Sequence, residues 1–189
     1  MNIVGRVKGI LLDPKAEWSK IAGEPGDAGF LFPNYVMILA AIPPVCTLIR
    51  TSLIGYGGFR LGIGTGLLHA IIVYVLSLVM VFVMAYVIDF LAGTFGGRSD
   101  LANAMRVASY SPTAAWVVGI FNLIPFLGVL AILGLYSVYL LHTGLAALMK
   151  PAADKAVIYT IAVVVCLVVL WFVVFGIVFG ILGMGMMTM

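Results

Sequence analysis

Four apolar runs, each at least as long as a membrane-spanning helix, restrict the folds open to this chain. They cover about residues 31–54, 67–95, 107–148 and 156–183, and about 20 apolar residues suffice to cross the hydrocarbon as a helix. Hydrophobic residues make up 64% of the 189 positions and charged residues only 9%, which is too little polar surface for a water-soluble globule of this size. The sequence therefore predicts an all-α integral membrane protein whose main partner is the lipid bilayer.

The third run is too long for one crossing. As a single helix, its 42 residues would reach roughly 63 Å, about twice the hydrocarbon thickness, so we expect it to fold back at NLIPFLG, residues 122–128. This gives five transmembrane helices in one domain, 31–183, after a cytoplasmic or interfacial amphipathic segment, 1–30, and before a Met-rich tail, 184–189. The predicted spans are about 31–54, 67–95, 107–122, 128–148 and 156–183. A rival interpretation makes 112–122 a re-entrant half-helix and leaves four spans.

The positions of the Lys and Arg residues separate these two topologies, because basic residues accumulate in cytoplasmic loops. With five spans and a cytoplasmic N-terminus, eight basic residues lie inside and only Arg50 and Arg60 outside; four spans give six against four. The count favours five spans with the C-terminus outside. The ten basic residues are spread along the chain and form no patch that would indicate nucleic-acid binding.

The segment before the first span is expected to form short interfacial helices. Apolar residues between 3 and 11 recur at helical spacing, which we interpret as a face opposite Arg6 and Lys8. Asp13 suits the N-cap of a second short helix, and this helix carries Trp18 to headgroup depth as an interfacial anchor. Both a plain membrane anchor and a lipid-sensing or partner-docking surface remain open.

Prolines and glycines mark the expected kinks and close helix contacts. A proline inside a helix removes a backbone donor and bends the helix, and two glycines four residues apart let helices approach closely, within one chain or between copies. Ser99 is a candidate N-cap for a short helix before the third span. The kink and packing positions are Pro43, Pro44, Pro112, Pro125, Gly176 and Gly180.

Asp89 is the one acid well inside an apolar run, MAYVIDFLAGTF. It lies about 9 Å from the cytoplasmic end of its span, and His142 lies about 12 Å from the same end of another span. An ionised carboxylate at that depth needs a partner, which His142, Arg98 or Arg106 could supply. A structural clamp and a proton-sensitive site both fit this pattern. The candidate polar site comprises Asp89, His142, Arg106, Tyr110 and Tyr139.

Chemistry beyond this site has little support in the sequence. The C-terminal thioethers of Met184, Met186, Met187 and Met189 are possible Cu(I) ligands, although a soft apolar tail explains them equally, and no other metal site is predicted. Motifs of metalloproteases, cysteine nucleophiles and nucleophile elbows do not occur. We therefore predict neither an enzyme nor a cofactor.

The order of several motifs resembles the Yip family of five-span membrane proteins, named for Ypt/Rab-interacting proteins, in its bacterial branch. Pro14, Trp18 and Ile21 precede the first span; AAIPPV lies in it; ASYSP precedes the third; IPFLG and LYSVYLLHTGL follow. The resemblance covers nearly the whole chain. The positions that match are Pro14, Trp18, Pro43, Ala108, Tyr110, Pro112, Pro125, Gly128, Tyr136, Tyr139 and Gly144.

In eukaryotes this resemblance implies early secretory traffic, contacts with prenylated Rab GTPases and association with related members. The N-terminal region here spans only about 30 residues and lacks the DLYGP-type segment of the eukaryotic members, which argues against Rab-type GTPase binding. We expect a bacterial cytoplasmic (inner) membrane protein, a non-enzymatic scaffold, organiser or trafficking-type factor that binds lipids, other membrane proteins or copies of itself. The alternative is a transporter or channel for a small solute, ion or lipid, with its polar site around Asp89 and His142.

Overall fold

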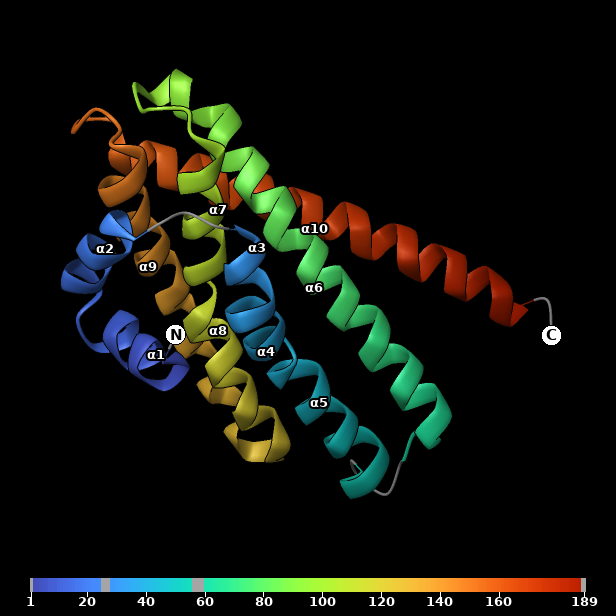
Figure 1. Ribbon diagram of the computed structural model, residues 1–189. Coiled ribbons are helices and arrows are strands. Elements are labelled where there is room, and N and C mark those ends of the chain that lie inside the picture. The colour runs from blue at the N-terminus through green and yellow to red at the C-terminus, as the bar shows by residue number, and fades with distance from the viewer. Residues whose placement is uncertain (1, 25–27, 56–59, 188–189) are drawn as a thin grey trace.

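The computed structural model describes residues 2–24, 28–55 and 60–187, and these ranges contain helices and no strand (Figure 1). Two short helices come first, and the remaining elements form a bundle. In chain order they are α1 (Ile3–Leu12), α2 (Pro14–Gly23), α3 (Ala28–Leu31), η1 (Phe32–Val36), α4 (Met37–Ala40), α5 (Ile42–Leu48), η2 (Ile49–Ile54), α6 (Ile63–Ala92), η3 (Gly93–Phe95), α7 (Leu101–Tyr110), α8 (Thr113–Val118), η4 (Gly119–Leu123), η5 (Pro125–Leu135), α9 (Tyr136–Gly144), η6 (Leu145–Met149) and α10 (Ala156–Met187).

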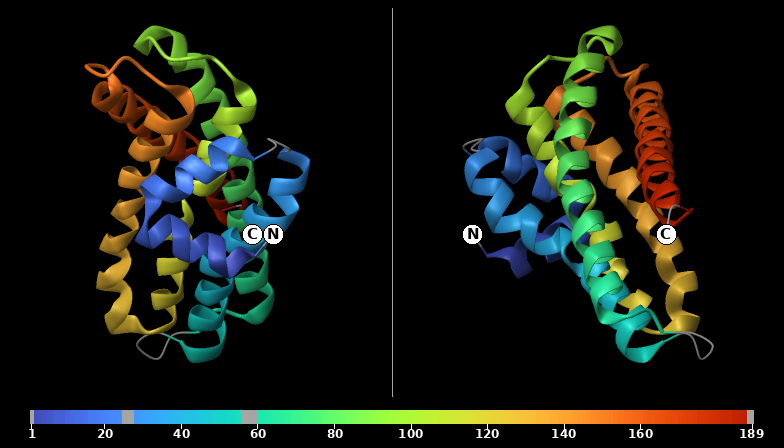
Figure 2. Two further views of the ribbon diagram at one scale, coloured as in Figure 1. Left: turned by 60° about the vertical axis from the view of Figure 1, so that its left-hand side comes forward. Right: turned by 90° about the vertical axis from the view of Figure 1, so that its right-hand side faces the viewer.

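Four helical stretches in the described residues are long and apolar enough to cross a membrane: Gly29–Ile54, Ile63–Phe95, Phe126–Met149 and Ala156–Val174. The expected span at 107–122 is not among them. That part of the chain is built from α7, α8 and η4, which are short because the helix stops at Ser111, directly before Pro112. The three elements nevertheless run one after another along the bundle, toward the end where η2 lies (Figures 1 and 2).

The first apolar stretch bends at a close contact with η4. Its helix is interrupted at Ala41, just before Pro43 and Pro44, because the prolines cannot donate to the preceding turn. A Cβ atom added to Gly119 would lie 2.7 Å from Cγ of Pro43, which is too close for two atoms that are not bonded. Only glycine at position 119 lets η4 pack against the proline bend.

Two loops meet at the other end of the bundle. The Arg98 amide donates to the Met149 carbonyl at 2.8 Å, and the Ala152 amide donates to the Phe95 carbonyl at 3.2 Å. The loop after η3 and the loop after η6 are therefore hydrogen-bonded neighbours. α10 starts beside them and runs away along α6 (Figure 1).

The two N-terminal helices and α10 lie on opposite sides of the bundle in the right-hand view of Figure 2. α1 contacts α8, and α2 contacts α9 and η6. Their inner side chains Ile10, Trp18 and Ile21 are fully buried together with Tyr35 and Tyr110 of the bundle. The N-terminal helices thus belong to the same core as the apolar helices.

Candidate functional site: the docking of the N-terminal helices

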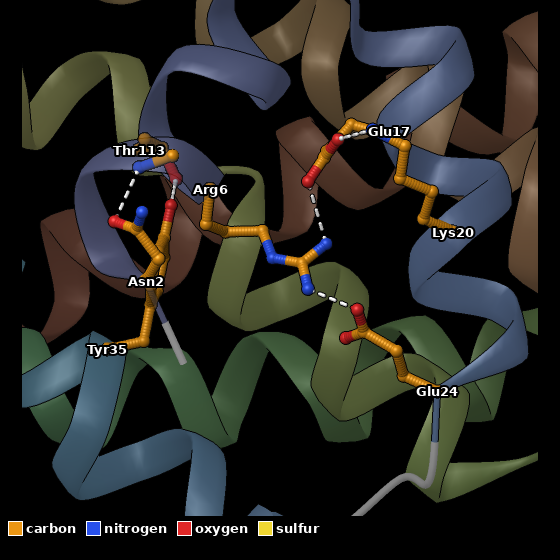
Figure 3. A network of polar contacts seen from close by, with 8 residues as sticks. Asn2, Arg6, Glu17, Lys20, Glu24, Tyr35 and Thr113 are labelled. Carbon is orange, nitrogen blue, oxygen red and sulfur yellow. Dashed lines mark hydrogen bonds and ion pairs between the residues drawn. The ribbon is translucent and has the colours of Figure 1, made fainter.

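A nearly buried cation joins the two N-terminal helices (Figure 3). Only 11% of the Arg6 side chain is exposed; its Nη1 donates to Oε1 of Glu17 at 2.8 Å, and its Nη2 donates to Oε1 of Glu24. Its guanidinium carbon also lies 5.7 Å from the centre of the Tyr110 ring, within the range of a cation–π contact. Burial disfavours the charge, but the hydrogen bond to Glu24 and the neighbouring acidic groups outweigh it, so the pKa of Arg6 is raised above its ordinary value.

Glu17 is the acceptor on which this contact is centred. Its second oxygen, Oε2, accepts from Nζ of Lys20 at 2.9 Å, so the buried carboxylate is paired on both sides. A Cβ atom added to Gly9 of α1 would lie 2.6 Å from the Glu17 carboxyl carbon. The absent side chain at position 9 therefore makes the room that brings α1 and α2 together around the carboxylate.

Arg106 of α7 binds the end of α2. Its Nη2 donates to the Glu24 carbonyl at 2.7 Å, and its Nη1 contacts the Ile21 carbonyl at 3.4 Å and Oδ1 of Asn103 at 3.1 Å. The last carbonyls of a helix have no partner within the helix, and a cation there also matches the helix dipole. Arg106 thus fixes α2 to the bundle.

Trp18 does not present its ring to lipid headgroups, which corrects its expected role as an interfacial anchor. Its side chain is fully buried, with its ring edge toward Tyr110 at a centroid distance of 6.1 Å. A Cβ atom added to Gly144 of α9 would lie 2.6 Å from Cζ2 of Trp18. The indole therefore lies against a bare stretch of α9 backbone, and protein replaces lipid as its surroundings.

Further contacts continue from this ring into the bundle. The rings of Tyr110 and Tyr35 lie 4.7 Å apart, and the Tyr35 hydroxyl is 2.8 Å from Oγ1 of Thr113. On the α1 side, the Tyr136 hydroxyl donates to the Leu11 carbonyl at 3.1 Å. Sequence reasoning grouped Arg106 and Tyr110 with Asp89, whereas the structure places both in contact with the N-terminal helices.

The outer face of α1 differs from the expected one. Arg6 lies on the buried side with the apolar residues, and the exposed stripe consists of Val4, Lys8 and Leu12. These three residues follow one another at intervals of four, so they share one face of the helix. Val4 is 64% and Leu12 82% exposed, so this stripe offers one apolar side chain on each side of the Lys8 cation.

Asp89 and His142 have separate partners. Ser99 donates its hydroxyl to Oδ1 of Asp89 at 2.9 Å, and Nδ1 of His142 lies 2.9 Å from Oγ1 of Thr160 in α10. Within the described ranges, neither a hydrogen bond nor an ion pair joins the acid to the imidazole. Tyr139 precedes His142 by three residues in α9 and is half-exposed beside Tyr136.

Asp89 lies near one end of a helix that is longer than the hydrocarbon is thick. α6 has 30 residues and a length of roughly 45 Å, against a hydrocarbon thickness of about 30 Å. Asp89 lies 26 residues, or roughly 39 Å, beyond Ile63 at the far end. Asp89 therefore lies close to one end of the candidate span Ile63–Phe95, and its hydroxyl partner Ser99 comes from the loop that follows this span.

The structure adds little about the predicted metal ligands and the other packing positions. No group of three or more His, Cys, Asp or Glu able to hold a metal ion occurs in the part of the chain that the structure describes. Apart from the backbone of α10 itself, no atom of the described chain comes within 4 Å of a Cβ atom added to Gly176. The side chains of Pro125, Met184, Met186, Met187 and Met189 and the surroundings of Gly180 lie outside the described part.

Comparison with known proteins agrees with this architecture. The Yip1 domain matches residues 8–175. Inner membrane protein YohC of Escherichia coli strain K12 is 30% identical over 156 residues, covering 78% of this chain and 80% of that protein, and YohC of Escherichia coli O6:H1 strain CFT073 matches to the same extent. No solved structure matches the chain. The match runs from α1 through most of α10, and the chain belongs to the Yip family of membrane proteins, in its bacterial branch.

Proposed function

We propose that this protein is a non-enzymatic scaffold of the bacterial inner membrane that binds partners, protein or lipid, through its docked N-terminal helices. The observation that carries the proposal is the exposed stripe of Val4, Lys8 and Leu12 on a helix whose opposite face is fixed by a buried ion pair. A helix that only anchored the chain would need no such rigid attachment. Apolar side chains beside a cation are typical of helices that engage anionic membrane surfaces.

The proposal includes five crossings, with the N-terminus in the cytoplasm and the C-terminus outside. Two segments that are hydrogen-bonded to each other lie on the same side of a bilayer, so the bonds between the 93–100 and 149–155 loops require an even number of crossings between them. The stretch Phe126–Met149 supplies one. This supports a second crossing by α7, α8 and η4, and the distribution of Lys and Arg supports the orientation.

Labelling of single cysteines tests this topology. In a protein that lacks Cys46 and Cys166, we expect Arg98→Cys and Asp154→Cys to react with a membrane-impermeant thiol reagent from the cytoplasmic side, and Arg60→Cys from the opposite side. Labelling of positions 98 and 154 from different sides would refute five crossings. Labelling of both from the outside would refute the orientation alone.

The binding role is tested by photocrosslinking in cells. We expect a photoreactive residue in place of Leu12 to capture a discrete adduct, whose mass identifies it as lipid or protein, and Lys8→Glu to abolish that adduct. Lys155→Glu changes a lysine that is likewise exposed, in the loop before α10, and serves as the matched control, with the adduct retained. An adduct that survives Lys8→Glu, or none at position 12, contradicts the proposal.

Transport of a polar solute gains no support from the described residues. Asp89 and His142 are paired separately, and the cleft between α6, α8, α9 and α10 is lined almost entirely by apolar side chains. A polar path would need hydrogen-bonding groups along its length.

A further inference from the structure

A cleft of about 550 Å³ opens between α6, α8, α9 and α10. Its volume lies within the range of sites for small ligands. Three serines, Ser77, Ser111 and Ser137, are the polar residues in an otherwise apolar lining. Val168 and Trp171 of α10, both about half exposed, leave the cleft open toward the surroundings of the bundle.

The bilayer decides what can fill this cleft. The lining belongs largely to stretches that are long and apolar enough to cross a membrane, where water is excluded. An unfilled cleft of this size would cost its walls their dispersion contacts. The bilayer supplies hydrocarbon chains, and one of them can enter the cleft laterally.

Apolarity alone would not retain a particular chain, because lipid tails are as apolar as the leucines they would contact. Ser111 supplies the missing specificity. The residue is 1% exposed, and its hydroxyl has no hydrogen-bond partner in the described part of the chain. A buried hydroxyl without a partner is costly, most of all in an apolar medium.

Ser111 also lies at a suitable depth. It follows Arg106 by five residues, or roughly 7.5 Å along the chain axis, and Arg106 binds the polar end of α2. The headgroup and interfacial region on each side of a bilayer is about 5–7 Å thick. With Arg106 at the headgroup surface, this offset brings Ser111 to the depth of the ester groups of a phospholipid. An ester carbonyl accepts from a serine hydroxyl.

We propose that this cleft binds one phospholipid of the bilayer, with an acyl chain between α6 and α10 and its ester carbonyl at the Ser111 hydroxyl. This site is distinct from the N-terminal docking face, so it stands whether or not the scaffold function holds. It makes a bound lipid part of the native bundle rather than a passing neighbour.

Quenching by brominated acyl chains tests the site, since Trp116 lines the cleft but is only 7% exposed. Three single-tryptophan proteins are reconstituted in vesicles of dibrominated phosphatidylglycerol. We expect emission of the Trp116-only protein to be quenched as strongly as that of the Trp171-only protein, whose ring is 49% exposed. The Trp18-only protein, whose ring is fully buried, sets the unquenched reference; Trp116 emission at that level overturns the proposal.

Matched variants locate the quencher. Ser77→Phe narrows the cleft and is expected to protect Trp116, whereas Val79→Phe adds the same ring on the same helix outside the cleft and is expected to leave quenching unchanged. Equal quenching in both variants would contradict a chain in the cleft. Protection of Trp116 with cross-linking between copies through Ser77→Cys would assign the cleft to a second copy and likewise overturn the proposal.

A second measurement uses the chain with all its tryptophans. Native mass spectrometry is expected to show one retained phospholipid per chain, and Ser111→Ala is expected to weaken its retention by about 2- to 12-fold, the range for loss of one hydrogen bond. Ser109→Ala is the control, because its hydroxyl is buried and unpartnered too but the residue does not line the cleft. A chain that retains no lipid, or equal loss in both variants, would count against the assignment of Ser111.

Discussion

Gly144→Ala should release α2 from the bundle. The added methyl would lie 2.6, 2.9 and 3.0 Å from Cζ2, Cη2 and Cε2 of Trp18, so three ring atoms must move together. The indole is rigid and fully buried, and the clash is relieved only if α2 shifts. Overpacking of this kind costs about 1–3 kcal/mol.

The whole overpacking cost of Gly144→Ala shifts the equilibrium between docked and released α2. Alanine also favours the helical state of α9 by up to about 1 kcal/mol over glycine, but α9 is helical whether α2 is docked or not, so that gain cancels. A cost of 1–3 kcal/mol corresponds to roughly 5- to 150-fold more frequent opening of α2. Hydrogen exchange of the α2 amides after Pro14, measured by mass spectrometry, should accelerate by that factor.

Two controls make the result specific to the ring contact. Gly176→Ala changes a glycine of α10 with open space around its Cβ position and should leave α2 protection unchanged. Trp18→Phe removes the ring atoms that clash, so adding it to Gly144→Ala should cost less than the sum of the two single changes. Unchanged α2 protection in Gly144→Ala would refute the reasoning, because the approach of Trp18 to α9 would then be free to relax.

Three further changes probe the remaining contacts. Glu17→Ala should destabilise the docked helices by about 1.5–3 kcal/mol, the range for hydrogen bonds to charged groups; Lys20→Ala, which removes an exposed partner of the same carboxylate, should cost under about 1 kcal/mol, and hydrogen exchange of α1 compares them. Arg106→Lys should raise exchange at the last turn of α2, because an ammonium group cannot reach two carbonyls as the guanidinium fork does. Asp89→Asn and His142→Ala should have additive effects on thermal stability, within about 0.5 kcal/mol; a larger coupling would revive a shared site.

The long apolar helices could be predicted from the sequence because each exceeds the length that only a bilayer accommodates. The fold of the third apolar run, residues 107–148, could be predicted only in part. The break between η4 and η5 falls inside the predicted fold-back at 122–128, but hydropathy could not foresee that α7 is an amphipathic helix whose Arg106 binds α2. Its N-cap is Asp100, whose side chain accepts from two backbone amides, rather than Ser99, which instead binds Asp89.

Arg6 shows how a charge can mislead. The residues Ile3, Val7 and Ile10 define the inner stripe of α1, and position 6 has the spacing of that same stripe. Its charge alone predicts a place for Arg6 on the polar face. Its partner Glu17 lies on another helix, and an ion pair between two helices cannot be predicted from the apolar periodicity of either one.

The two proposed sites meet at consecutive residues of one turn, since Tyr110 contacts Trp18 and Ser111 lines the cleft. We nevertheless expect them to act independently. Oγ1 of Thr113 donates to the Tyr110 carbonyl at 2.6 Å and lies 2.8 Å from the Tyr35 hydroxyl, so the turn stays fixed when Trp18 leaves. Gly144→Ala should therefore speed exchange in α2 while lipid retention, measured by native mass spectrometry, stays unchanged. If retention fell together with α2 protection, the docked helices and the cleft would be coupled, and by reciprocity a bound lipid would strengthen docking.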